Sequence, residues 1–119
     1  MRAAIVIVAL LGAIALAGPP AKTQALLDTG KRIYEGSAAG CFACHGYTGE
    51  GNGPVAFALK PPPRNFQKDP FKGGDKVEQI FASITNGLTG TQMVAYDRLP
   101  EADRWALAYY VLSFRTSRR

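Results

Sequence analysis

Both cysteines of the chain and its single histidine lie in the five residues Cys41-Phe42-Ala43-Cys44-His45. Each thiol can add to a haem vinyl group to form a thioether, and the adjacent imidazole can ligate the iron, which is the chemistry that this spacing suits. The pattern is short enough to arise by chance, but an apolar leader precedes it and a glycine-rich stretch follows it, as a protein that binds haem covalently requires. We therefore predict one covalently bound haem c, with Cys41 and Cys44 as thioether anchors and His45 as an axial ligand.

Three other uses of these residues are less favoured. A structural zinc ion takes four nitrogen or sulfur ligands, and the chain offers only two cysteines and one histidine. A dithiol redox motif stands at the start of a helix after a strand in an α/β sheet, and no alternating or β-branched run precedes Cys41. A plain disulfide leaves the following histidine unexplained.

The first 17 residues have the layout of a signal peptide. Arg2 supplies the positive end, residues 3–11 the apolar core and Ala15-Leu16-Ala17 the small-x-small cleavage signal. The uncharged stretch, residues 3–17, is short for a membrane span, which needs about 20 residues. We expect cleavage after Ala17 and export to the periplasm. A retained leader would instead anchor the protein in the membrane.

The rest of the chain has room for one domain. We expect a linker at residues 18–22, the domain at residues 23–116 and a basic tail at residues 117–119. A domain of this size is near the lower limit for burying an adequate core, and haem would add a large apolar plate at its centre. The formal charge of +5 suits an acidic docking patch on a redox protein partner better than it suits nucleic acid.

The apolar pattern predicts helices and no strand. Thr23 can cap a helix over residues 23–35, which Gly36 would end. Asp75-x-x-Glu78 has the form of a capping box for a second helix, which would end at Asn86-Gly87. Pro100 can occupy the first turn of the last helix. The expected fold is all-α, with three to five helices around the haem.

The segments between these helices are expected to form the walls of a haem crevice. Residues 46–54 contain four glycines and must turn tightly, whereas residues 60–66 contain three prolines and should be extended and stiff. Met93 lies in a loop between two helices, from which its thioether can reach the far face of the ring. Because His45 is the only histidine and Met93 the only methionine after the leader, we favour Met93 as the sixth ligand over a role as core filler.

In the order of these features the chain resembles the monohaem class I c-type cytochromes over essentially the whole mature sequence. The features that match are Gly30 and Tyr34 in the first helix, C-F-A-C-H, the glycine-rich loop ending at Gly53-Pro54, the methionine loop at residues 90–96, and Trp105 and Tyr109 in the last helix. Val94 stands where a proline often follows the methionine ligand, and the basic tail is not part of the family pattern.

The resemblance implies a set of site residues. It makes His45 and Met93 the axial ligands, and it implies that the Pro54 carbonyl accepts a hydrogen bond from His45 Nδ1. It also implies that the two terminal helices cross, with Gly30 facing the aromatic residues of the last helix.

A ligand pair of this kind suits electron transfer rather than catalysis. Histidine and methionine fill both axial positions, so substrate and dioxygen find no open site, and the thioether raises the reduction potential. We expect a carrier of single electrons between the redox proteins of a respiratory or photosynthetic chain or a dehydrogenase, free or as a subunit of a membrane-associated redox complex. The alternative is a five-coordinate catalytic or gas-binding haem with Met93 off the iron. Four-helix-bundle cytochromes, which have open sites, carry C-x-x-C-H near the C-terminus, whereas here it lies near the N-terminus.

A basic segment is the candidate docking surface. Between Lys60 and Lys76 the local charge is +3, because five basic residues, Lys60, Arg64, Lys68, Lys72 and Lys76, oppose Asp69 and Asp75. This segment is expected beside the haem edge, where it would steer an acidic partner. Arg64 is also a candidate for bonding a haem propionate.

Overall fold

The computed structural model describes residues 3–5 and 18–116. Within these residues it contains four α-helices, one 3-10 turn and no strand, so the all-α expectation is confirmed. The elements are α1 (Gln24–Glu35), α2 (Cys41–His45), η1 (Ala56–Ala58), α3 (Val77–Asn86) and α4 (Glu101–Thr116). The predicted signal peptide, apart from residues 3–5, and the basic tail at residues 117–119 lie outside the described part of the chain. In that part, no helix is long and apolar enough to cross a membrane.

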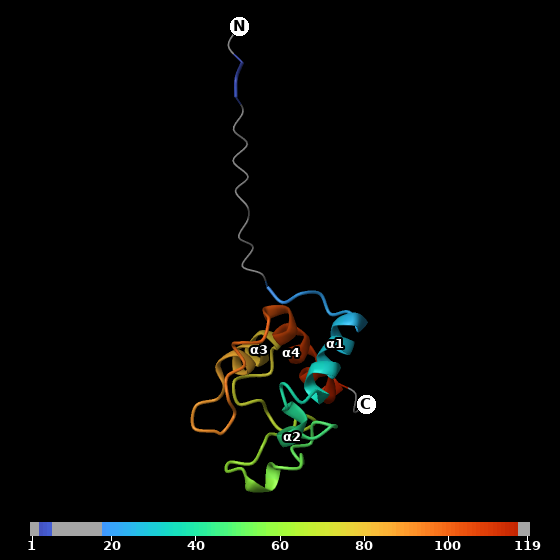
Figure 1. Ribbon diagram of the computed structural model, residues 1–119, viewed down its shortest axis with the longest axis vertical. Coiled ribbons are helices and arrows are strands. Elements are labelled where there is room, and N and C mark those ends of the chain that lie inside the picture. The colour runs from blue at the N-terminus through green and yellow to red at the C-terminus, as the bar shows by residue number, and fades with distance from the viewer. Residues whose placement is uncertain (1–2, 6–17, 117–119) are drawn as a thin grey trace.

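α1 and α4 cross and make the most extensive helix–helix contact among the described elements (Figure 1). α1 begins as predicted, because Thr23 Oγ1 accepts a hydrogen bond from the backbone nitrogen of Leu26 at 3.1 Å. Gly30 is buried at the crossing, and a β-carbon added there would lie only 2.7 Å from Cβ of Tyr110. Glycine therefore allows the two helices to approach, as the resemblance implied, but the residues of α4 that it meets are Ala106 and Tyr110 rather than Trp105 or Tyr109.

The start of α3 differs from the predicted capping box. The residue before the helix is Lys76, and its backbone nitrogen donates to Gln79 Oε1 at 3.0 Å, so neither Asp75 nor Glu78 caps the helix. Asp75 is engaged elsewhere: one carboxylate oxygen accepts from the Phe71 backbone nitrogen at 3.0 Å, and the other pairs with Arg115 at 3.1 Å. The prediction was wrong because contacts distant in sequence take up the carboxylate that the local pattern assigned to the cap.

α4 is the scaffold of the molecule, since it packs against both α1 and α3. Its Leu107 is fully buried, and Trp105 stacks on Phe81 of α3 with ring centroids 3.9 Å apart. The core on which the site rests consists of Tyr34, Phe66, Ile80, Ile84, Leu107, Ala108, Val111 and Phe114.

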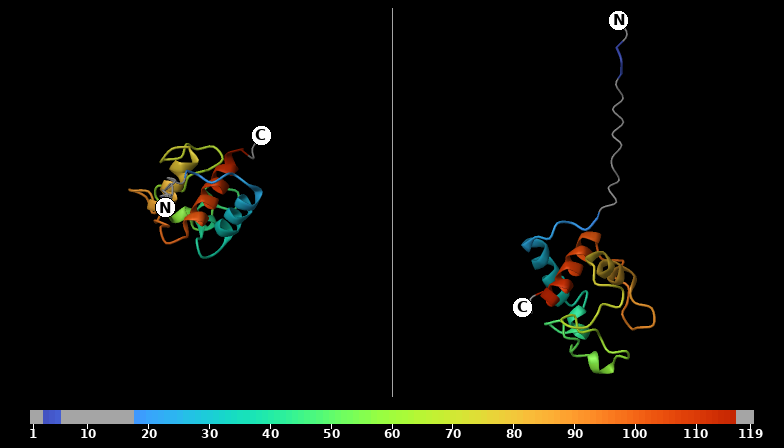
Figure 2. Two further views of the ribbon diagram at one scale, coloured as in Figure 1. Left: turned by 90° about the horizontal axis from the view of Figure 1, so that it is seen from above. Right: turned by 180° about the vertical axis from the view of Figure 1, so that it is seen from behind.

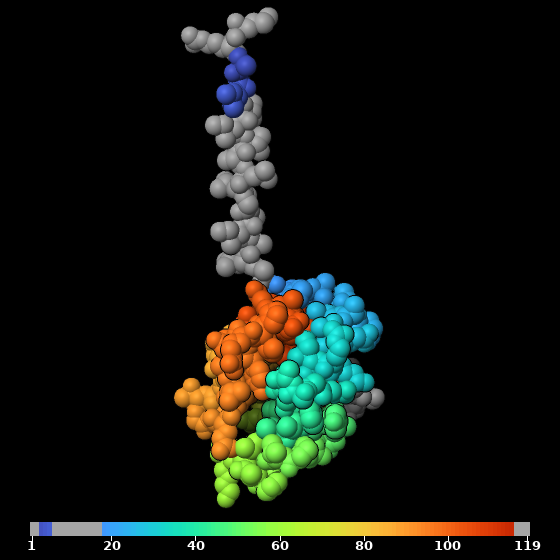
Figure 3. All heavy atoms as spheres, in the orientation of Figure 1, coloured from blue at the N-terminus to red at the C-terminus, as the bar shows by residue number. Residues whose placement is uncertain are grey.

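Two loop-rich segments extend from the helices and leave a space between them. Residues 46–76 lead from α2 through η1 to the start of α3, and residues 87–99 connect α3 to α4 (Figure 2). In the space-filling view, the surface is hollowed between these two segments (Figure 3). The helices therefore form a frame, and the least regular parts of the chain border the site.

Candidate haem site

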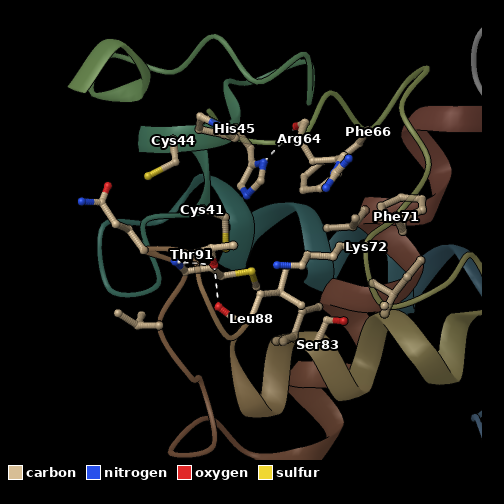
Figure 4. Close-up of a pocket in the computed structure, with 18 of the residues that line it drawn as sticks. Cys41, Cys44, His45, Arg64, Phe66, Phe71, Lys72, Ser83, Leu88 and Thr91 are labelled. Carbon is tan, nitrogen blue, oxygen red and sulfur yellow. Dashed lines mark hydrogen bonds between the residues drawn. The ribbon is translucent and has the colours of Figure 1, made fainter. Parts of the chain in front are cut away.

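A cavity of about 480 Å³ lies between α2, residues 59–73, α3 and the loop of residues 87–99 (Figure 4). Its volume falls within the roughly 300–1,000 Å³ that is usual for cofactor and ligand sites. All four residues predicted to hold haem line it: Cys41, Cys44, His45 and Met93. Positions separated by up to 52 residues in sequence thus meet at one site.

His45 is held in the form that can ligate a metal. Its ring stacks on Phe66 with centroids 4.2 Å apart, and burial lowers the pKa of the imidazole, which keeps it neutral. Nδ1 lies 3.2 Å from the carbonyl oxygen of Arg64. When Nδ1 carries the proton and donates it to this carbonyl, Nε2 is left with the free lone pair that an iron ligand needs.

The resemblance had implied that the Pro54 carbonyl accepts the hydrogen bond from His45 Nδ1. In the structure the acceptor is instead the Arg64 carbonyl. Residues 51–55 lie against the backbone of α2, where Gly51, Gly53 and Val55 donate to the carbonyls of His45, Cys44 and Ala43. Because the backbone N–H groups of this loop bond the carbonyl groups at the end of α2, the loop does not reach the imidazole. The proline-rich segment lies beside the imidazole instead. A hydrogen bond from the Phe66 backbone nitrogen to Gly49 O, at 2.6 Å, fixes that segment beside the ring.

The two cysteines are free thiols. Burial raises the pKa of Cys41 to about 11 and also raises that of Cys44, so both are protonated at neutral pH. Thiols of dithiol oxidoreductases have a lowered pKa, which is the opposite behaviour. The electrostatics of the site therefore argue against the redox-motif alternative.

Met93 is presented by a loop with its own hydrogen bonds. Thr91 Oγ1 donates to Leu88 O at 2.7 Å and accepts from the Met93 backbone nitrogen at 3.2 Å. These contacts turn the chain just before Met93 and rigidify the loop where the sequence has Val94 in place of a proline. Val94 itself is 62% exposed.

Other residues of the cavity were not predicted as site residues. Phe66 and Phe71 form an apolar wall, and the Ser83 side chain lines the cavity from α3. Tyr96 lines it as well, and burial raises the pKa of its hydroxyl to about 12. The only signal for Tyr96 in the sequence is its own position, since it is an aromatic residue three positions after Met93.

Arg64, which was predicted as a candidate for bonding a haem propionate, also lines the cavity.

These residues fit haem c and do not fit a bare metal ion. Within the described ranges, no group of three or more His, Cys, Asp or Glu side chains is placed to hold an ion. The donor set is instead two thiols, a neutral imidazole and a thioether around an apolar cavity, which matches covalent haem with two axial ligands. Cys41 and Cys44 would anchor the ring, and His45 and Met93 would reach the iron. Bound haem supplies a reversible one-electron couple at this position.

The fold and this donor set define an all-α protein built around a covalent haem. A family model described as cytochrome c matches residues 27–115, and the chain belongs to the cytochrome c family. Membership is consistent with a class I c-type cytochrome and implies covalently bound haem c and haem-based electron transfer.

One solved structure extends the comparison. A chain of the reducing HAO-like protein complex of Kuenenia stuttgartiensis is 33% identical, with a TM-score of 0.75, over 82% of this chain and 47% of that one. The present chain thus spans about half the length of that relative. No curated protein sequence matches it significantly.

Proposed function

We propose that this protein is an exported monohaem cytochrome c that passes single electrons between redox proteins. The observation that carries the proposal is that His45 and Met93 line one cavity together with both cysteines. A haem held between these two ligands has no open coordination position, so it exchanges electrons without binding substrate.

The alternative is a five-coordinate haem that binds gas or catalyses a reaction. Among the described residues, the tight turn at Thr91 holds Met93 at the cavity, which supports the six-coordinate assignment. The two proposals predict different behaviour of the ferrous protein toward carbon monoxide. The carrier should leave its absorption spectrum unchanged when CO is added, and a CO-shifted Soret band in the wild type would favour the alternative.

The partners we propose are redox proteins with an acidic docking patch, one donating and one accepting the electron. Lys72 and Arg64 line the cavity, and the exposed Lys60 lies between two of its lining residues, Leu59 and Pro61. Positive charge therefore adjoins the opening through which a haem edge would be reached. The related chain belongs to a protein complex, which supports the variant of this proposal in which the cytochrome is a subunit of a redox complex.

Export to the periplasm is the remaining part of the proposal, and its support is the layout of residues 1–17. Expression of the full chain in a bacterium that matures c-type cytochromes should give a soluble periplasmic holoprotein that begins at Gly18 and carries one haem per chain. Ala17→Leu should block cleavage and move the product to the membrane fraction, whereas Ala21→Leu should not. Cytoplasmic apoprotein of full length, or more than one haem per chain, would contradict the proposal.

A further inference from the structure

Tyr96 joins the two sides of the cavity. Its hydroxyl donates to the carbonyl oxygen of Ala39 at 2.8 Å, across 57 positions of the sequence. Ala39 is buried and lies two residues before Cys41, so this bond ends on the segment that leads into α2. Tyr96 itself lies three residues after Met93. One hydrogen bond thus connects the segment presenting the methionine with the segment presenting the cysteines and histidine.

The backbone of Tyr96 is fixed as firmly as its side chain. Its nitrogen donates to Ile84 O of α3 at 2.9 Å, and its carbonyl accepts from the Leu99 nitrogen at 3.0 Å. Ile84 is buried in the core. Tyr96 is therefore a fixed point from which the hydroxyl bond can resist outward movement of the loop.

The other bonds of the loop do not span the cavity in this way. Thr91 makes contacts within the loop. Lys72 Nζ donates to Thr89 O at 3.0 Å, which ties the loop to the wall formed by residues 59–73 and not to the cysteine segment. Arg104 Nε donates to Leu99 O beyond Tyr96, which ties the end of the loop to α4. Among the described residues, these bonds shape the loop, hold its end or join it to residues 59–73, and Tyr96 is the residue that ties it to the cysteine segment.

We propose that Tyr96 is a positioning residue: by bonding Ala39 it holds the loop against the cysteine segment and keeps Met93 within reach of the iron. The inference rests on the proposed function, in which Met93 is the sixth ligand. It goes beyond that function by naming the residue that opposes loss of this ligand.

The test is the replacement of Met93 by an added ligand. Tyr96→Phe keeps the ring and removes the hydroxyl, and Tyr109→Phe is the matched control, because Tyr109 donates a similar bond to Pro20 O at 2.6 Å away from the cavity. The ferric holoproteins are titrated with imidazole. A hydrogen bond of ordinary net strength corresponds to a change of roughly three- to tenfold, so Tyr96→Phe should bind imidazole tighter by about that factor. Tyr109→Phe should bind it as the wild type does.

A double-mutant cycle separates positioning from a general loss of stability. In a Met93→Ala protein there is no methionine to hold, so Tyr96→Phe should cause no further increase in imidazole affinity. If the increase persists without Met93, or if Tyr96→Phe leaves the affinity unchanged in the Met93 protein, the positioning role is wrong. If Met93→Ala itself leaves the affinity unchanged, the ligand assignment in the proposed function fails instead.

A second measurement serves if Tyr96→Phe yields no holoprotein. Amide hydrogen exchange of the wild-type ferric protein is recorded with and without saturating imidazole. Displacement of Met93 should speed exchange in residues 88–96 and also in residues 37–41, because the bond joins these segments. Faster exchange confined to residues 88–96 would overturn the inference.

Discussion

Gly30 of α1 faces Tyr110 of α4 at a distance that leaves no room for a side chain on α1, since an added β-carbon would lie 2.7 Å from Tyr110 Cβ. Gly30→Ala should therefore force the helices apart and lower the free energy of unfolding by about 1–3 kcal/mol, the usual cost of overpacking. Denaturant unfolding of the holoprotein measures this. Lys31→Ala, at an exposed position on the same helix, should change the value by no more than about 0.5 kcal/mol. If Gly30→Ala leaves the free energy of unfolding unchanged, the two helices pack less closely than described.

The two cysteines should determine whether the chain folds at all. Single Cys41→Ala or Cys44→Ala variants should give at most a single-thioether product, and the double variant should give largely unfolded apoprotein. Without haem, a cavity of about 480 Å³ with largely apolar walls would be left at the centre of a domain that is already near the lower limit for burying an adequate core. Mass spectrometry and far-ultraviolet circular dichroism test both statements, with Ser37→Ala as the control. Native helical content in the haem-free double variant would contradict them.

How far the fold and site could be predicted differs between local and long-range features. The cap at Thr23 depends on a few adjacent residues and was predicted correctly from them. The close approach at Gly30 joins helices about 80 positions apart, and it was expected only because the resemblance to a family implied it. The acceptor for the His45 hydrogen bond was predicted wrongly. It depends on which of two segments, residues 51–55 or the proline-rich segment, bonds to the carbonyl groups of α2 and which lies beside the imidazole.

The same reasoning explains the remaining errors. Asp75 was predicted to cap α3, but Arg115, 40 positions away, pairs with its carboxylate. The role of Tyr96 depends on Ala39, which is 57 positions away. Contacts at such separations are set by tertiary packing and leave no periodic signal in the sequence.

Alkaline pH should weaken the fold through Tyr34. This side chain is fully buried, donates its hydroxyl to Gly46 O at 2.6 Å, and has a pKa raised well above 10 by desolvation. The unfolded chain loses this proton near pH 10, whereas the folded chain keeps it to higher pH. The contribution of Tyr34 to the free energy of unfolding is therefore fully present below pH 10 and is lost as the pH rises above it. The slope contributed by one proton is at most about 1.4 kcal/mol per pH unit.

The variant Tyr34→Phe isolates this effect. It should be less stable than the wild type at neutral pH, because Gly46 O loses its donor, but it should lose less additional stability between pH 10 and pH 12. Unfolding curves across this range make the comparison, and Tyr109→Phe, at a less buried position, serves as the control. If the free energy of unfolding falls with pH equally steeply in the wild type and in Tyr34→Phe, groups other than Tyr34 cause the loss of stability at alkaline pH.

Docking should depend on the basic segment. Lys60 and Lys68 are exposed, so Lys60→Glu/Lys68→Glu reverses charge without disturbing the bond from Lys72 to Thr89. The second-order rate of electron transfer with the native partner should fall as ionic strength rises from about 0.01 M to about 1 M, where the Debye length shrinks from about 30 Å to about 3 Å. The charge reversal should lower the rate at low salt, whereas Lys22→Glu/Lys31→Glu should have a smaller effect. Rates that are independent of salt and of both variants would exclude electrostatic steering by this segment.

The central claim is that Met93 ligates the iron opposite His45, and the ferric absorption spectrum tests it most directly. The wild-type holoprotein should show the weak long-wavelength charge-transfer band of methionine bound to ferric haem. Met93→Ala should lose that band, bind carbon monoxide when reduced and have a lower reduction potential, because a soft axial thioether is removed. Val55→Ala, at an exposed position that does not line the cavity, should behave as the wild type does. A Met93→Ala protein with an unchanged potential and no affinity for carbon monoxide would contradict the account and make Lys72, which also lines the cavity, the first residue to test as the ligand.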